Sequence, residues 1–216
     1  MTFSYSARSR AIEPFHVMAL LQRANELQAA GHDVIHLEIG EPDFNTAEPI
    51  IQAGQAALSA GHTRYTAARG LPALREAIAG FYASRYSLNI NPERIMITPG
   101  GSGALLLASA LLVDPGKHWL LADPGYPCNR HFLRLVEGDA QLVPVGPEVN
   151  YQLTADLVER YWDQDSVGAL VASPANPTGT VLSREELAAL SAALRERGGH
   201  LVVDEIYHGL TYGMDA

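Results

Sequence analysis

The amino-acid sequence predicts an α/β fold of three layers, in which helices cover both faces of a mainly parallel sheet. From Arg94 onward, short apolar runs of strand length alternate with segments that repeat apolar residues at helical spacing. The connections between these segments are short, which is typical of βαβ units. The run Leu201–Val203 is wholly apolar, as expected for a strand that is covered on both faces.

The expected elements follow one another along the chain. Helical spacing and helix start signals predict helices over residues 14–30, 49–60, 71–84, 104–112, 129–137, 154–161 and 183–197. Apolar runs predict strands over residues 34–39, 94–98, 118–122, 141–145, 168–173 and 200–204. Ser183 and Glu186 stand three residues apart and predict a capping box for the last helix. Residues 1–12 are expected to form a flexible or partner-contacting arm.

The composition is that of a globular chain. With 216 residues, 47% hydrophobic and 18% charged, the chain can bury a sizeable core. A formal net charge of −9 argues against a nucleic-acid partner, which usually requires a basic face. No run reaches the roughly 18–20 apolar residues of a membrane helix, and the first residues lack the apolar segment of a secretory signal. Cys128 is the only cysteine, which excludes an internal disulfide and suits a reducing compartment, so we expect a cytoplasmic protein.

The sequence predicts neither a metal centre nor a serine nucleophile. His32 and His36 are four residues apart, but Gly31 and the strand-like run between them argue against a shared helical face. The chain contains no G-x-S-x-G turn of the kind that presents a nucleophilic serine.

A glycine-rich turn, Thr98–Ala104, joins a predicted strand to a predicted helix. Glycines let a ligand approach the backbone closely, and the helix N-terminus favours an anion, so Gly101 and Ser102 are candidate phosphate contacts. A plain glycine-rich turn is an equally good interpretation of this stretch alone. A dinucleotide-binding turn is a weaker alternative: Asp123 stands at a suitable distance, but Leu106 occupies the place of the third glycine.

Four polar or aromatic residues follow the predicted strands at their carboxyl ends, where open α/β sheets bind ligands. Tyr126 can stack on an aromatic ring, and the Asn176 amide can donate to a ring oxygen. Asp204 can pair with a protonated ring nitrogen, and Tyr207 can donate to an oxyanion. Taken singly, each has an ordinary structural alternative, such as packing, turn formation or helix capping. Their combination is much more specific.

These stretches together resemble the fold-type I, pyridoxal-phosphate-dependent aminotransferases of class I/II, over roughly residues 16–212. The resemblance implies pyridoxal 5′-phosphate as cofactor and amino acids and 2-oxo acids as substrates. It implies that Gly101 and Ser102 hold the phosphate, that Tyr126 stacks on the pyridine ring and that Asn176, Asp204 and Tyr207 contact the ring atoms. It further implies that Gly40 contacts the substrate carboxylate and that Tyr65 reaches the phosphate of a neighbouring subunit, and hence a homodimer.

The resemblance also implies a domain arrangement. Residues 1–45 would hold an N-terminal arm and a small-domain segment, and residues 46–216 the N-terminal part of the cofactor-binding large domain.

One residue that such an enzyme requires has no counterpart here. In the family, a Schiff-base lysine follows the Asp–Tyr element by about thirty residues, which is beyond Ala216. Lys117 is the only lysine in the sequence, and it precedes a predicted strand, at the opposite end of a parallel sheet from the site. We therefore expect the chain to be the N-terminal part of a longer protein, with no catalytic residue of its own and with an exposed sheet edge.

Three alternative functions stay open from the sequence. A lyase or decarboxylase of the same fold would use the same cofactor and the same residues. A non-catalytic half-protein that binds a ligand or a partner would need no lysine. An oxidoreductase that binds a nucleotide would rest on the turn between Gly101 and Asp123.

Overall fold

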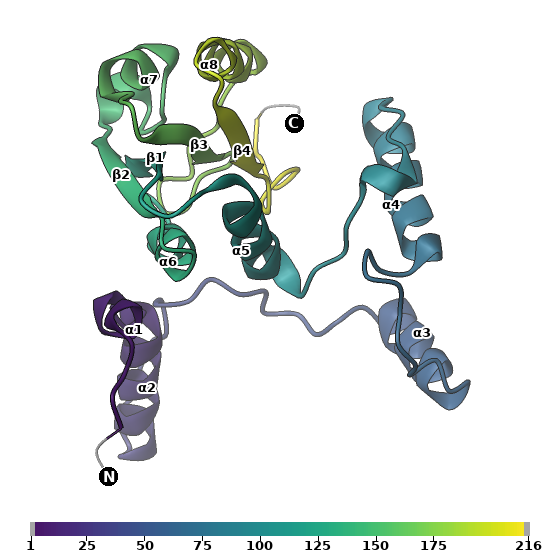
Figure 1. The fold of residues 1–216 in the computed structure, drawn as a ribbon. Coiled ribbons are helices and arrows are strands. Elements are labelled where there is room, and N and C mark those ends of the chain that lie inside the picture. Colours follow the sequence, from purple (N-terminus) through teal and green to yellow (C-terminus); the bar gives the residue numbers. More distant parts are fainter. Residues whose placement is uncertain (1–2, 214–216) are drawn as a thin grey trace. The chain divides into compact units, whose positions relative to one another are not determined.

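The computed structural model describes residues 3–213, which form two compact units (Figure 1). One unit combines the N-terminal residues through Phe15 with the residues from Gly100 onward, and it contains the sheet. The other unit is His16–Pro99 and is helical. The predicted domain division at residue 45 stays a prediction.

The sheet has four parallel strands in the order β2-β1-β3-β4. In chain order they are β1 (His118–Asp123), β2 (Asp139–Pro144), β3 (Ser166–Ala172) and β4 (His200–Asp204). All four were predicted, each within two residues at either end, because their buried runs leave little choice of register. The α/β prediction is confirmed.

Helices cover both faces of this sheet (Figure 1). On one face lie α5 (Gly100–Leu112) and α6 (Cys128–Leu135), and on the other lie α7 (Ala155–Tyr161) and α8 (Arg184–Glu196). Two short helices complete the unit: α1 (Ala7–Ala11) and the 3₁₀ turn η2 (Pro147–Val149).

Neighbouring residues of β1 belong to different cores, because successive side chains of a strand point to opposite faces. Trp119 packs in the core that lies beneath α5 and α6, and Leu120 packs in the core beneath α7 and α8; both side chains are fully buried. Helix α8 begins with the predicted capping box, in which Ser183 Oγ accepts from the Glu186 N–H and the Glu186 carboxylate accepts from the Ser183 N–H.

The helical unit contains α2 (His16–Ala29), α3 (Glu48–Ser59), α4 (Pro72–Tyr86) and the 3₁₀ turn η1 (Pro92–Arg94). Among the described residues of this unit, Arg75 is the only charged residue whose side chain is buried. The Arg75 guanidinium donates to Glu93 Oε1 at 2.9 Å and to the Pro92 carbonyl at 3.0 Å, which ties α4 to η1.

Two predicted strands, 34–39 and 94–98, are wrong. Both segments are extended, but neither pairs with another strand within residues 3–213. Ile35 and Leu37 are apolar yet 82% and 88% exposed, so their pattern does not report burial in this unit. The backbone of Ile97 donates instead to the Arg69 carbonyl at 3.1 Å, which is a single contact and not a ladder.

The start of one helix also differs from expectation. Helix α5 begins at Gly100, four residues before the predicted start, so Gly101 and Ser102 are helical.

Within the described residues, no helix is both long and apolar enough to cross a membrane.

Candidate functional site

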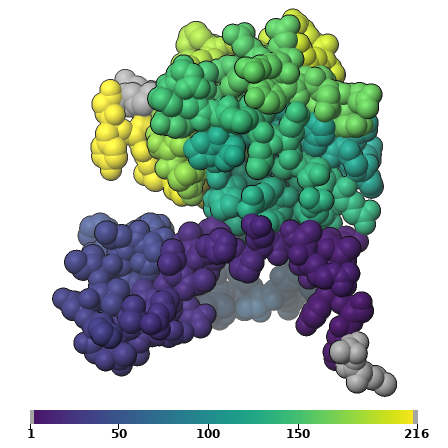
Figure 2. All heavy atoms as spheres, turned by 90° about the vertical axis from the view of Figure 1, so that its left-hand side faces the viewer, coloured from purple at the N-terminus to yellow at the C-terminus, as the bar shows by residue number. Residues whose placement is uncertain are grey.

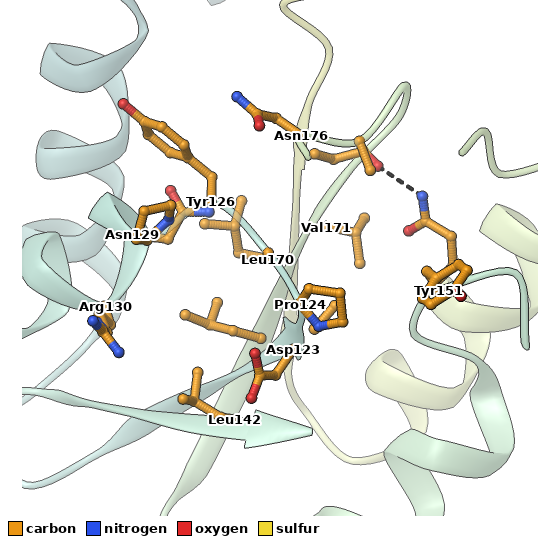
Figure 3. Close-up of a pocket in the computed structure, with 17 residues that line it drawn as sticks. Asp123, Pro124, Tyr126, Asn129, Arg130, Leu142, Tyr151, Leu170, Val171 and Asn176 are labelled. Carbon is orange, nitrogen blue, oxygen red and sulfur yellow. Dashed lines mark hydrogen bonds between the residues drawn. The ribbon is translucent and has the colours of Figure 1, made fainter. Parts of the chain in front are cut away.

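Three strands end at the same edge of the sheet, because they are parallel and in register. Asp123 ends β1, Ala172 ends β3 and Asp204 ends β4. A cavity of about 150 Å³ opens at this carboxyl edge (Figure 3). Its lining is contributed mainly by the ends of β1 and β3 and by the loops that follow them. Tyr126 and Asn176 lie on one side of it (Figure 3).

The turn after β1 aims Tyr126 at the cavity. In Asp123–Pro127, a Cβ on Gly125 would meet the Ala122 carbonyl oxygen at 2.5 Å, so the turn accepts only glycine there. The Tyr126 carbonyl accepts from the Asn129 N–H at 3.2 Å, which joins the turn to the first residues of α6.

The Tyr126 phenol is the most perturbed titratable group of the site. A hydrogen bond with the Cys128 thiol, partial burial and the electrostatic influence of Cys128, Tyr207 and Asp204 together raise the pKa of Tyr126 to about 12. The phenol therefore stays protonated and neutral at any physiological pH. The influence of Asp204 and Tyr207 on this pKa indicates that both residues lie near Tyr126.

Asp204 stands where β4 ends and is half-buried. Its carbonyl accepts from the Ser173 N–H at 3.0 Å, which fixes the end of β4 against the end of β3. Its side-chain Oδ1 accepts from the Ile206 N–H at 3.1 Å, so the acid also caps the following turn. That turn carries Tyr207, which is 39% exposed.

The loop that presents Asn176 is held by a residue that the sequence did not single out. The buried Gln152 amide donates to the Ala172 carbonyl at 3.0 Å and to the Thr180 carbonyl at 3.2 Å. It thereby bridges the two ends of the loop around Asn176, which is half-buried and lines the cavity. A lone glutamine in a loop carries no periodic signal, and its partners lie 20 and 28 residues away in the chain.

Gly101 and Ser102 lie outside the lining of this cavity, in the first turn of α5. Since α5 ends at Leu112 and β1 begins at His118, the helix runs antiparallel to the strand on which it packs. Its 13 residues span about 20 Å, as does β1, so its N-terminus returns to the carboxyl edge of the sheet. A Cβ on Gly101 would meet no atom within 4 Å, so a ligand has room there.

The two other predicted contacts, Gly40 and Tyr65, belong to the helical unit and not to the unit that holds the sheet. Both are exposed in that unit. Their roles stay predictions.

Two further residues at the cavity were missed by sequence reasoning. The Oδ1 atom of Asn129 is buried without a hydrogen-bond partner among the described residues, although it lines the cavity. Arg130, the next residue, also lines the cavity and forms an ion pair with Glu13 at 3.0 Å. The start of a helix shows no pattern that distinguishes such residues from ordinary surface residues.

The family model for class I and II aminotransferases matches residues 32–216. Among curated relatives, the valine–pyruvate aminotransferase of Mycobacterium tuberculosis is 39% identical over 93% of this chain. The aspartate aminotransferase of Geobacillus stearothermophilus is 34% identical over 95% of it. These alignments cover 52% of each relative, so the chain spans about half the length of the curated relatives it matches.

Solved structures give the same result. A Mycobacterium tuberculosis aminotransferase superposes with a TM-score of 0.93 at 38% identity, over 98% of this chain and 54% of that one. The Thermus thermophilus aspartate aminotransferase with maleate superposes with a TM-score of 0.93 at 33% identity, over 99% and 56%. With a family match over most of its residues, the chain belongs to the class I and II aminotransferases.

Proposed function

We propose that these 216 residues provide the cofactor-facing part of a pyridoxal-phosphate-dependent aminotransferase, which moves an amino group between an amino acid and a 2-oxo acid. The observation that carries the proposal is the grouping of Tyr126, Asp204 and Tyr207 at the carboxyl edge of the sheet. In this grouping, the flat ring of Tyr126 suits the face of a phosphorylated pyridine, the Asp204 carboxylate suits its ring nitrogen, and the Tyr207 phenol suits its ring oxygen.

The residues present fit this cofactor. The N-terminus of α5 offers N–H groups and a positive dipole end beside the open space at Gly101, which suits a phosphate. The cavity beside Tyr126 and Asn176 also contains the unpartnered Asn129 Oδ1, which a polar ligand could satisfy. The neutral Tyr126 phenol adds no negative charge that would repel a phosphate.

Each residue then has one physical task. The cofactor, when bound, supplies a protonated pyridine ring that withdraws electrons from the substrate. The Asp204 carboxylate holds the proton on the ring nitrogen, because an opposite charge favours the charged form. Asn176 and Tyr207 donate to the ring oxygen, Tyr126 covers one ring face, and Gly101 and Ser102 hold the phosphate.

These residues bind and orient the ring, but amino transfer also requires a lysine that accepts and returns a proton. Lys117 does not meet this requirement. Its Nζ donates to Asp165 Oδ1 at 2.8 Å and to the Gln164 carbonyl at 3.3 Å, at the edge of the sheet where the strands begin. We infer that the catalytic lysine comes from outside these 216 residues. The position of Lys117 therefore also favours a second candidate function: ligand binding without turnover by this chain alone.

The names of the relatives support amino transfer over lyase or decarboxylase chemistry, since all those compared above are aminotransferases. They act on different substrates, valine with pyruvate in one case and aspartate in another. We propose that an amino acid is the donor and a 2-oxo acid the acceptor, and that Gly40 contacts the substrate carboxylate. We also propose a homodimer, in which Tyr65 reaches the phosphate bound by the neighbouring subunit, and a cytoplasmic location.

The test is the affinity of the chain for pyridoxamine 5′-phosphate, measured by equilibrium dialysis. This form of the cofactor carries an amine, so it binds without a covalent bond to any lysine. Asp204→Asn keeps the shape and the hydrogen bond from Ile206 but removes the charge. Because a charge-assisted hydrogen bond contributes about 1.5–3 kcal/mol, we expect the variant to bind roughly 10- to 100-fold more weakly.

Asp114→Asn is the matched control, since it makes the same charge change at the opposite edge of the sheet, where Asp114 is exposed. We expect this variant to bind as the unchanged chain does. Equal affinity of the Asp204 and Asp114 variants would refute the assignment of Asp204. Absence of binding by the unchanged chain would refute the proposed cofactor site.

A further inference from the structure

The N-terminal residues run along α6 in the opposite direction to the helix. Beyond the C-terminal end of α6, Arg8 forms an ion pair with Glu137 at 3.0 Å. Near the helix N-terminus, Glu13 forms an ion pair with Arg130 at 3.0 Å. The two pairs hold residues 8–13 against the helix over most of its length. In Figure 2, the dark purple N-terminal residues lie against the teal and green part of the chain.

The same stretch ends beside Tyr126, which lines the cavity. Phe15 packs against Tyr126 with ring centroids 6.0 Å apart and ring planes at 78°, which is an edge-to-face pair. Phe15 is half-buried by this contact, whereas Phe3, in the same arm, is 89% exposed. The arm therefore places one particular aromatic side chain at the site.

Tyr126 needs such support because its backbone lies in a turn and not in the ladder of the sheet. The ring can rotate about two side-chain bonds, so the direction of its face depends on what packs against it. A perpendicular ring beside it fixes that orientation, since edge-to-face pairs have a defined geometry. The ion pairs of Arg8 and Glu13 in turn fix the arm that carries Phe15.

We propose that Phe15 is a positioning residue for Tyr126: the arm, anchored on α6, holds the Phe15 ring perpendicular to the Tyr126 ring and thereby sets the surface on which the cofactor ring stacks. The part that concerns the cofactor rests on the proposed function. The contact between the two rings stands without it.

The experiment compares Phe15→Ala, Phe15→Tyr and the arm control Phe3→Ala in the 216-residue chain. The first readout, without ligand, is the ¹H–¹³C spectrum of ring-labelled tyrosine, with the Tyr126 signals assigned by their loss in Tyr126→Phe. We expect Phe15→Ala to shift these signals, because the neighbouring ring current disappears, and the other two variants to leave them near their original positions.

The second readout is the affinity for pyridoxamine 5′-phosphate. We expect Phe15→Ala to bind about 3- to 10-fold more weakly, from the usual strength of an aromatic pair, and Phe15→Tyr to restore binding. Adding Phe15→Ala to Tyr126→Ala should weaken binding no further, since Phe15 acts through Tyr126. A general loss of folding would instead weaken binding in both backgrounds.

The outcomes separate the two proposals. Unshifted Tyr126 signals in Phe15→Ala overturn the positioning role, and so do shifted signals with unchanged affinity. Shifted signals in a chain that does not bind pyridoxamine 5′-phosphate at all support the ring contact and overturn the proposed cofactor site.

Discussion

Lys117 Nζ donates to Asp165 Oδ1 at 2.8 Å, and each of the two residues directly precedes a strand of the sheet. The pair therefore lies at the amino edge of β1 and β3, whereas the candidate site lies at the carboxyl edge. Six residues of β1 separate the two edges, or about 20 Å at the rise of a strand. No rotamer of a lysine side chain covers that distance.

This separation predicts that Lys117→Arg leaves the affinity for pyridoxamine 5′-phosphate unchanged. Arginine keeps the charge and the ion pair with Asp165, so the fold is preserved as well. The chain should also show no transamination when an amino donor and a 2-oxo acid are supplied. A weaker affinity of Lys117→Arg would contradict the first statement, and turnover by the unchanged chain would contradict the second.

The bridge made by Gln152 predicts a large effect on stability from a small change. In Gln152→Leu, the carbonyls of Ala172 and Thr180 lose a buried donor, which costs about 1–3 kcal/mol in the free energy of unfolding. Gln164→Leu, which changes an exposed residue of the same unit, should cost far less. Urea unfolding of the two variants checks this, and similar midpoints would show that the bridge contributes little.

The sheet and the residues at its carboxyl edge could be predicted because both follow from local patterns. A buried run such as 168–173 fixes a strand, and in a parallel sheet the residues after each strand meet at one edge. That rule places Tyr126, Asp204 and Tyr207 at the same edge of the sheet. How close these residues lie to one another depends on the strand order, which is β1-β3-β4 in this part of the sheet.

Contacts between distant, non-repeating residues could not be predicted in this way. Phe15 and Tyr126 are separated by 111 positions, and neither lies in a periodic pattern that indicates the other. The run 34–39 failed for a related reason: an apolar alternating segment becomes a strand only when another strand pairs with it. A sequence pattern indicates that a segment tends to form a strand, whereas the pairing of that strand with another depends on the whole fold.

The capping box of α8 predicts a dependence of stability on pH. Hydrogen bonds from Ser183 lower the pKa of Glu186, so the folded state favours the ionised carboxylate. A lowered pKa contributes stability above the unfolded value of about 4.3, and this contribution disappears as the pH falls through the folded pKa. Glu186→Gln should therefore be less stable than the unchanged chain at pH 7, by less than about 1 kcal/mol because the pair is exposed.

The difference should vanish at an acidic pH below the folded pKa of Glu186, where both chains carry a neutral side chain. Glu185→Gln is the control, because Glu185 lies in the same first turn but outside the capping box. Urea unfolding at pH 7 and at the acidic pH measures how far the free energy of unfolding of each variant differs from that of the unchanged chain. A gap for Glu186→Gln that persists at low pH would show that the carboxylate charge is not its cause.

The outer edge of β4 predicts self-association. Within residues 3–213, β4 pairs only with β3, so one side of its backbone is left without a strand, while β3 is paired on both sides. An open edge with apolar residues such as Val202 is a template for another strand. We expect the sedimentation coefficient to rise with protein concentration, and amide exchange in β4 to slow over the same range. Amides of β3 serve as the internal control, because their hydrogen bonds are already made within the chain. A monomer whose β4 amides exchange at the same rate at every concentration would contradict the prediction.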